Sequence, residues 1–229
     1  MPAAVLADVD VVLVSHADHA DNLDRAGRSF ALGAPRLLTC PDSARALGGG
    51  AKGLRTWESV EVAEGLTVTA VPAQHGPADG ERDAHGHVNC EVTGFVIRAS
   101  RGHGQGDDAT SSRATRIYLT GDNASLELIA QVRDRFGRPD HAVINAGRAA
   151  VPGKLEGRPL SLSGERASAA ASVLGAPHVV LAHQTGWDHF TDGPCASLRA
   201  FRDVGPLGVL ERAPEGEWST GPMPGPFGG

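Results

Sequence analysis

The sequence predicts a mixed α/β protein with a single domain over residues 1–229. Three observations support this fold class. The chain is long enough, and with 41% hydrophobic residues apolar enough, to bury one sizeable core. Short apolar segments typical of strands alternate with segments of helical periodicity. Several of the apolar segments run directly into a histidine or an aspartate, which indicates that one edge of the sheet carries the function.

Seven segments have the length and apolar composition of β-strands. They are residues 9–14, 36–40, 66–71, 92–98, 116–120, 142–145 and 178–182. Helices are expected from the spacing of apolar residues over 128–136 and 165–174, with Ser163 suited to cap the second, and near 194–203. Residues 99–115, rich in Gly, Ser and Asp, predict a mobile loop, and residues 213–229 a flexible tail.

The composition restricts the class of partner. A net charge of −6 disfavours nonspecific binding of nucleic acid and leaves a small molecule as the expected substrate. No apolar run approaches the roughly 20 residues that span a bilayer, so we expect no membrane span and a cytoplasmic location. Cys40, Cys90 and Cys195 stand at wide spacings without a CxxC pair. This pattern fits buried or idle thiols in a reducing compartment and argues against zinc ligation by cysteine.

Candidate metal ligands follow the ends of several expected strands. His16 and His19 come directly after residues 9–14, and His75, Asp122 and His183 each follow a later strand. Because an α/β fold gathers strand ends at one edge of a sheet, we expect these side chains to converge. Imidazole and carboxylate are a normal ligand set for zinc. Asp122 has a second reading, as the N-cap of the helix that follows, and the two roles can coexist.

These motifs together resemble the metallo-β-lactamase superfamily. The resemblance rests on Val-Leu-Val-Ser-His16-x-x-His19-x-Asp21-Asn22-Leu23-Asp24, followed by His75, by Thr120-Gly121-Asp122 and by His183. More narrowly, Gly186-Trp187-Asp188-His189-Phe190 is similar to a stretch of the branch that includes ascorbate-phosphate lactonase-like hydrolases. The resemblance implies an αββα sandwich. It also implies that N-terminal strands are lacking here, because the metal motif begins only a few residues after the start of the sequence. Two explanations are open. Either the start codon is assigned too late, or a partner or a homo-oligomer contact covers the exposed edge of the sheet.

The resemblance implies two metal sites. His16, His19 and His75 would hold one ion, Asp122 would bridge, and Asp21 with His183 would hold the second. The family signature H-x-H-x-D-H is altered here, since one residue is added between the first two histidines and Asn22 replaces the last one. A neutral amide is a weak ligand, so the second site is expected to be weak or empty.

A competing register of the motif remains open. It reads His16-x-Asp18-His19 as the H-x-D-H part and places Val14 where the first histidine belongs. His16 and His19 are ligands in both registers. Outside the ligand set, Asp18, Asn22, Trp187 and His189 are candidates for supporting the ligands or lining the substrate pocket, with Trp187 and Phe190 equally suited to the core.

The expected function is that of a metal-dependent hydrolase. One or two divalent ions, zinc or manganese, would supply a metal-bound hydroxide that attacks an ester, a lactone or a phosphodiester. Asp21 is the candidate catalytic residue, which orients the water and carries its proton. Two alternatives stay open: an iron-dependent redox enzyme with the same ligands, and a metal-binding scaffold without turnover.

Overall fold

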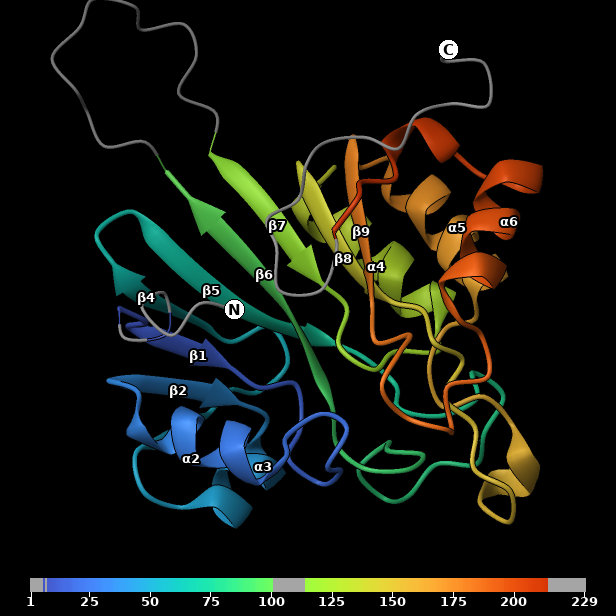
Figure 1. Ribbon diagram of the computed structural model, residues 1–229. Helices are drawn as coiled ribbons and strands as arrows, with labels where there is room; N and C mark the ends of the chain where they lie inside the picture. Colours follow the sequence, from blue (N-terminus) through green and yellow to red (C-terminus); the bar gives the residue numbers. More distant parts are fainter. Residues whose placement is uncertain (1–5, 7, 101–113, 214–229) are drawn as a thin grey trace, which may run out of the picture.

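The computed structural model describes residues 6, 8–100 and 114–213 and contains two β-sheets with helices on their outer faces (Figure 1). The smaller sheet has the order β1-β2-β3 and is parallel, and the larger has the order β4-β5-β6-β7-β8-β9. In the larger sheet the pairs from β4 to β7 are antiparallel, and β7, β8 and β9 are parallel. The strands are β1 (Val11–Leu13), β2 (Arg36–Thr39), β3 (Ala51–Gly53), β4 (Ser59–Ala63), β5 (Leu66–Pro72), β6 (Thr93–Ala99), β7 (Thr115–Leu119), β8 (His141–Asn145) and β9 (His178–Ala182).

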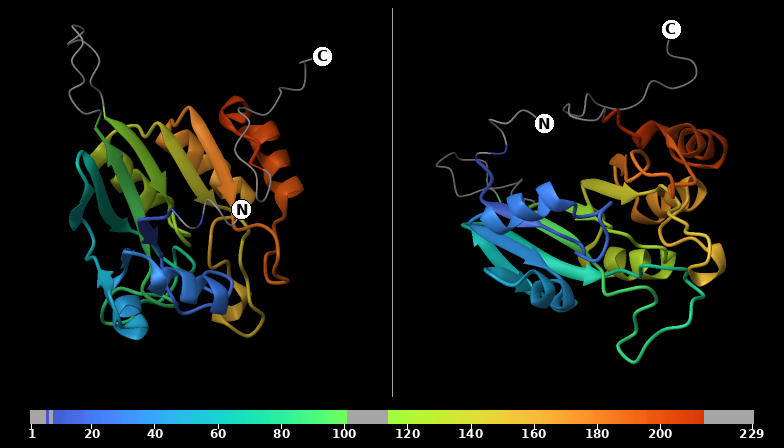
Figure 2. Two further views of the ribbon diagram at one scale, coloured as in Figure 1. Left: turned by 60° about the vertical axis from the view of Figure 1, so that its left-hand side comes forward. Right: turned by 60° about the horizontal axis from the view of Figure 1, so that its bottom comes forward.

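Helices cover both outer faces, which gives the four layers of an αββα sandwich (Figure 2). The helices are α2 (Arg25–Gly33), α3 (Pro41–Leu47), α4 (Leu126–Phe136), α5 (Gly164–Leu174) and α6 (Pro194–Val204), with the short 3-10 turns η1 (Leu155–Gly157) and η2 (Leu207–Val209). The expected cap of α5 is confirmed, because Ser163 Oγ accepts the N–H of Arg166. Asp122 is not the cap of α4. The Ser125 side chain fills that position and accepts the N–H of Leu128.

Three apolar layers hold the sandwich together. Between the sheets, Leu38 and Leu54 pack with Val68 and Phe95. Beneath α2 and α3 lies a small cluster that includes Leu37. The largest layer lies between the larger sheet and α4, α5 and α6; its most buried large side chains are Tyr118, Ile129, Ile144, Leu162, Leu174 and Phe201. Each such aliphatic or phenyl side chain stabilises the fold by about 1.5–3 kcal/mol through burial.

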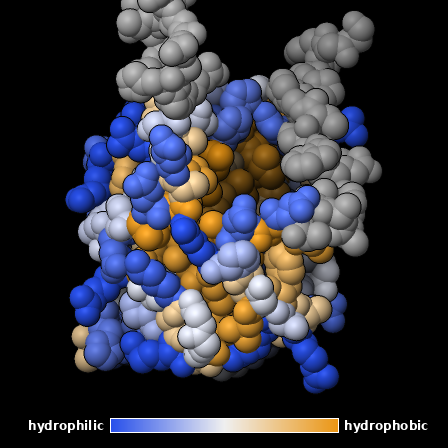
Figure 3. Space-filling model, turned by 90° about the vertical axis from the view of Figure 1, so that its left-hand side faces the viewer, coloured by the Kyte–Doolittle hydropathy of each residue, from blue (hydrophilic) through white to orange (hydrophobic). Residues whose placement is uncertain are grey.

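The inner face of the larger sheet is less completely covered than its helical face. Since side chains alternate across a strand, Ile117, Val143 and Val180 point to the face opposite Tyr118, Ile144 and Val179, and all three are only partly buried. On the side of the molecule that carries β1 and β4, hydrophobic residues form a hollowed area framed by hydrophilic ones (Figure 3). The three-stranded sheet is thus narrower than the six-stranded sheet on which it packs.

The predicted strands are all present, with ends that differ by one or two residues from those expected. The predicted mobile loop falls mostly, and the predicted tail almost wholly, outside the described residues; the outermost residues of that loop, Ala99 and Thr115, belong to β6 and β7. Among the described helices, none combines the length and the apolar character needed to cross a membrane.

Candidate metal centre

The strand ends bring the candidate ligands to one edge of the two sheets. His16 follows β1, His75 follows β5, Asp122 follows β7 and His183 follows β9 directly. At this edge Gly121 has φ +59°, and a Cβ there would lie 2.7 Å from the carbonyl oxygen of Thr93. Glycine therefore permits the close approach of the β7 end to the neighbouring chain, which places Asp122 inside the site.

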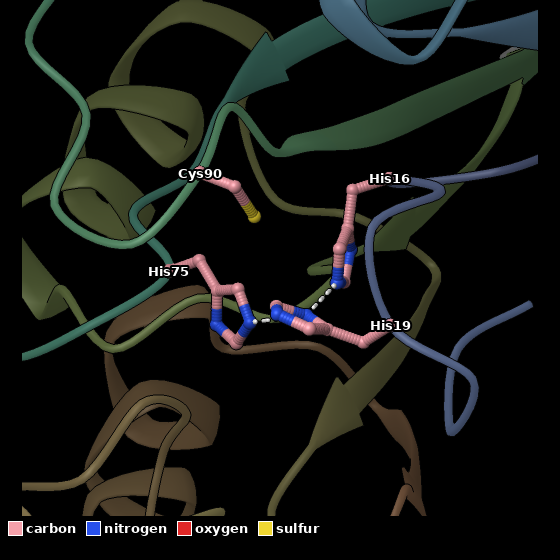
Figure 4. Close-up of side chains that lie close together, drawn as sticks. All are labelled: His16, His19, His75 and Cys90. Atoms are coloured by element: carbon pink, nitrogen blue, oxygen red, sulfur yellow. Dashed lines mark hydrogen bonds between the residues drawn. The ribbon is translucent and has the colours of Figure 1, made fainter. Parts of the chain in front are cut away.

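Three imidazoles, of His16, His19 and His75, form what we call the histidine cluster (Figure 4). His19 Nδ1 lies 3.2 Å from His16 Nε2 and 3.2 Å from His75 Nε2. Two nitrogen ligands of one tetrahedral zinc ion, with bonds of about 2.0–2.1 Å, lie about 3.3 Å apart. The spacing of these nitrogens therefore fits ligands of one ion.

A hydrogen bond fixes the tautomer of His75, and so determines which ring nitrogen offers its lone pair to the cluster. His75 Nδ1 lies 2.9 Å from the carbonyl oxygen of Leu160, which can only accept a hydrogen bond, so the proton of the neutral ring is on Nδ1. Nε2 then carries the lone pair and points to His19. A metal-ligating histidine is ordinarily held in this way by its other ring nitrogen.

A chain of hydrogen bonds through Ser15 fixes the tautomer of His16 in the same way. The Ser15 hydroxyl donates to Asn22 Oδ1 at 3.1 Å and therefore accepts from His16 Nδ1, also at 3.1 Å. The Asn22 amide nitrogen donates to the carbonyl of His16, which fixes the orientation of the amide. Asn22 thus lies against the backbone and Ser15, where it supports His16 rather than offering an oxygen to an ion.

Burial favours the neutral form of His16 and His19. The pKa of His16 is lowered from 6.5 to about 3, chiefly by burial; the nearby Asp122 opposes this shift, and the His75 and His19 rings contribute to it. The pKa of His19 is also lowered, first by burial and then by the nearby His75 and Lys154. Neutral imidazole is the form that binds a metal ion.

Asp21, Asp122 and His183 form a second group, which we call the carboxylate cluster. His183 Nδ1 lies 3.4 Å from Asp122 Oδ1, and its Nε2 lies 3.6 Å from Asp21 Oδ2. Both ring nitrogens of His183 are buried without a hydrogen-bond partner among the described residues. Asp122 is held by a 2.7 Å hydrogen bond from the Asn145 amide, and its other oxygen lies 3.9 Å from His75 Nε2. Asp122 therefore stands between the two clusters, and an ion held by the carboxylate cluster would satisfy one of the two unpaired nitrogens of His183.

His189 holds the carboxylate of Asp21. Its Nε2 lies 2.8 Å from Asp21 Oδ2. Burial alone would raise the pKa of Asp21, but the hydrogen bond from His189 and the charges of His183 and His189 outweigh it and lower that pKa. Asp21 is therefore an ionised carboxylate at neutral pH, ready to bind a cation or accept a proton.

The remaining sequence candidates do not belong to either cluster. Asp18 is exposed and belongs to neither cluster, whereas Asp21, the aspartate of the first register, belongs to the carboxylate cluster. Val14 is buried in the small core beneath α2 and α3. Trp187 is 45% exposed and so is not a core residue, while Phe190 packs against the His183 ring with centroids 4.3 Å apart.

Cys90 was not expected at the site, yet its Sγ belongs to the same group of converging ligand atoms as the three imidazoles (Figure 4). The sequence pattern argues against zinc ligation by cysteine, but the structure places this thiol within reach of the three imidazoles. Cys90 precedes β6, which runs antiparallel to β5 with Pro72 opposite Thr93. The start of β6 thus lies at the same edge as the end of β5, a relation that appears only once the pairing direction is known.

An αββα sandwich with imidazole and carboxylate clusters at its strand ends defines a metal-binding fold. The sequence pattern of the beta-lactamase superfamily domain matches residues 1–184, and the chain belongs to this family. It is 30% identical over 200 residues to a protein named UPF0173 metal-dependent hydrolase from Methanocorpusculum labreanum, covering 87% of this chain and 78% of that protein. The class expected from the sequence, a metal-dependent hydrolase of the metallo-β-lactamase fold, is confirmed at the level of family and fold.

Solved structures support the same fold. An isothiocyanate hydrolase from Delia radicum gut bacteria matches with a TM-score of 0.66 and 21% identity over 88% of this chain and 72% of that chain. A possible metal-dependent hydrolase from Veillonella parvula matches with a TM-score of 0.73 and 15% identity over 93% and 77%. CmlA, a diiron β-hydroxylase from Streptomyces venezuelae, matches with a TM-score of 0.59 and 14% identity over 90% and 44%. The fold is therefore shared by proteins named for different chemistries.

Proposed function

We propose that this protein hydrolyses a small-molecule ester, lactone or phosphodiester with one or two divalent ions held at the histidine and carboxylate clusters. The observation that carries the proposal is the convergence of three imidazoles, in which His19 Nδ1 lies 3.2 Å from Nε2 of His16 and from Nε2 of His75, while Nδ1 of each of those two rings is already hydrogen-bonded. The predicted ligands are His16, His19 and His75 for one ion and Asp21, Asp122 and His183 for the other.

Divalent ions in these positions would lower the pKa of a water molecule and polarise the oxygen of the substrate that becomes negative. Asp21 is our candidate general base. It is ionised, it borders the carboxylate cluster, and His189 holds one of its oxygens, so the other can orient a water and receive its proton. The Asn145 amide keeps Asp122 aimed at the space between the clusters.

The surroundings favour a small substrate with an anionic group. Lys154 Nζ lies 3.5 Å from His19 Nε2 and brings a positive charge to the edge of the site. A cavity of about 600 Å³ adjoins His183 between β9 and α6, a size that suits a small molecule, and its walls include Leu181, Leu198 and Leu210. Such a site could bind a phosphodiester or an acidic lactone with an apolar part, in keeping with the lactonase-like branch that the motifs resemble.

We also propose the class of substrate, the cellular location, the oligomeric state and the metals. The acidic net charge favours a small-molecule substrate over nucleic acid. We also propose a cytoplasmic location and, because the inner face of β7–β9 is partly open, a homo-oligomer. Zinc and manganese are the proposed metals.

An iron-dependent redox enzyme is the second candidate function. Two carboxylates in one cluster suit iron as well as zinc. The similarity in fold to the diiron hydroxylase is compatible with this candidate. It predicts consumption of oxygen by the iron-loaded protein with a reductant, which a hydrolase does not show.

Turnover assays would test the proposal. Esters, lactones and phosphodiesters are offered to the parent protein, to His75→Ala and to His141→Ala, an exposed histidine at the opposite end of β8. We expect metal-dependent hydrolysis of at least one class, lost in His75→Ala and retained in His141→Ala. Tight metal binding without hydrolysis of any class would contradict the proposal and favour a scaffold.

A further inference from the structure

The segment that carries Cys90 is hydrogen-bonded on one side to His75 of the histidine cluster and on the other to Ser15, the neighbour of His16. The N–H of Asn89 donates to the carbonyl of His75 at 3.0 Å, and the N–H of Thr93 donates to the carbonyl of Ser15 at 3.1 Å. Cys90 is thus positioned between the chain that carries His75 and the chain that carries His16. Figure 4 shows its thiol pointing toward the three imidazoles.

The thiol of Cys90 is placed differently from the other two. Its Sγ and the three imidazole nitrogens all lie within 4.8 Å of one another. The Cys40 thiol, by contrast, donates a hydrogen bond to Ser43 Oγ at 3.2 Å, and Cys195 is exposed at the start of α6. In the part of the chain that the structure describes, the Cys90 thiol is free of any disulfide and has no hydrogen-bond partner. Its position at the cluster is therefore not explained by a bond to a neighbouring group.

We propose that Cys90 Sγ is the fourth protein ligand of the ion bound by His16, His19 and His75. This inference rests on the proposed metal binding described above. Mixed histidine and cysteine sets are normal for zinc, and thiolate is among its preferred donors. On binding, the thiol gives its proton to the solvent and Sγ forms the bond to the ion, so nothing is oxidised or reduced.

A thiolate ligand decides between the two proposed metals. Sulfur is a soft donor that selects zinc, whereas manganese prefers carboxylate, carbonyl and water oxygens. The histidine cluster with Cys90 is therefore a zinc site, while the carboxylate cluster accepts either metal. Four protein donors also fill a tetrahedral ion, whereas three leave one position open for water. The water-binding role then falls to the side of Asp21, Asp122 and His183.

Cobalt(II) reports directly on such a ligand, because a cobalt-bound thiolate adds a charge-transfer absorption in the near ultraviolet that imidazole and carboxylate ligands do not give. The metal-free protein is titrated with two equivalents of Co(II), which suffices for both clusters, and the bound metal is measured independently. The same titration is made on Cys90→Ser and on the matched variants Cys40→Ser and Cys195→Ser, with circular dichroism to verify folding.

We expect the charge-transfer band in the parent, in Cys40→Ser and in Cys195→Ser, and its loss in Cys90→Ser. We also expect the preference of the histidine cluster for zinc over manganese to be weaker in Cys90→Ser than in the parent, because three imidazoles alone still favour zinc but lack the soft thiolate donor. A parent protein that binds cobalt without the band, or a band that persists in Cys90→Ser, would overturn the assignment of Cys90 and leave the hydrolase proposal intact. A folded parent that binds no cobalt would contradict both.

A second measurement covers the case in which Cys90→Ser does not fold. Iodoacetamide labelling of the unaltered protein is followed at each cysteine by peptide mass spectrometry, with and without zinc. Zinc should slow the labelling of Cys90 and leave that of the exposed Cys195 unchanged. Equal labelling of Cys90 with and without bound zinc would count against the ligand role.

Discussion

The loss of stability of the metal-free protein in acid tests whether burial lowers the pKa of His16. Burial holds the pKa of this ring near 3 in the folded protein, against 6.5 in the unfolded chain. Between these values the unfolded chain binds more protons, so the stability contributed by neutral His16 is complete above about pH 6.5 and is lost as the pH falls toward 3. The slope is about 1.4 kcal/mol per pH unit, which amounts to about 2 kcal/mol between pH 6.5 and pH 5.

The assay is urea denaturation in the presence of a chelator at pH 7 and pH 5, on the parent and on His16→Gln. Glutamine does not titrate, so the loss of unfolding free energy between the two pH values should be smaller in the variant by about 2 kcal/mol. His141→Gln, which alters an exposed imidazole, should behave as the parent does. If His16→Gln and the parent lose the same free energy on acidification, the argument from burial is refuted.

Three further substitutions test the supporting contacts of the site. Ser15→Ala removes the hydroxyl that orients the first imidazole, and zinc affinity measured by chelator competition should fall about 10–100-fold; unchanged affinity would contradict the role of this chain of hydrogen bonds. His189→Ala removes a hydrogen bond that lowers the pKa of Asp21, so the acidic limb of the kcat/KM profile should move to higher pH, and an unmoved limb would argue against Asp21 as the base. Gly121→Ala forces a side chain into left-handed backbone beside a carbonyl oxygen and should cost about 1–3 kcal/mol in urea denaturation. Gly153→Ala, strained at φ +81° but facing open space, should cost less.

The sequence predicts seven of the nine described strands, because each of these is a short apolar segment with a clear end; it does not predict β3 and β4, which carry charged or polar residues among few apolar ones. It does not predict the helices α2 and α3. The helix α2 has nine residues, of which only Ala31 is buried, while Phe30 and Leu32 are substantially exposed, so few buried apolar residues mark it in the sequence. The helix α3 has only seven residues, too few for periodicity to show.

The sequence likewise predicts some residues of the site and not others. The ligands that come after strands could be expected to converge, because parallel strands end at one edge of a sheet. Cys90 could not, since it precedes an antiparallel strand, and the pairing direction depends on contacts between distant segments. The role of Asn22 was equally hidden. Its residue type indicates a weak ligand, but the hydrogen bonds to Ser15 and to the His16 carbonyl appear only in the folded chain.

The metal content of the purified protein shows whether the strand-end ligands hold an ion. Elemental analysis is made on the parent protein purified without added metal, and on His16→Ala and His183→Ala. We expect one or two equivalents of zinc or manganese in the parent and less in each variant, because each substitution removes a donor from one of the two clusters. A folded parent protein without bound metal, or variants with undiminished content, would contradict the claim that the strand-end ligands form a metal centre.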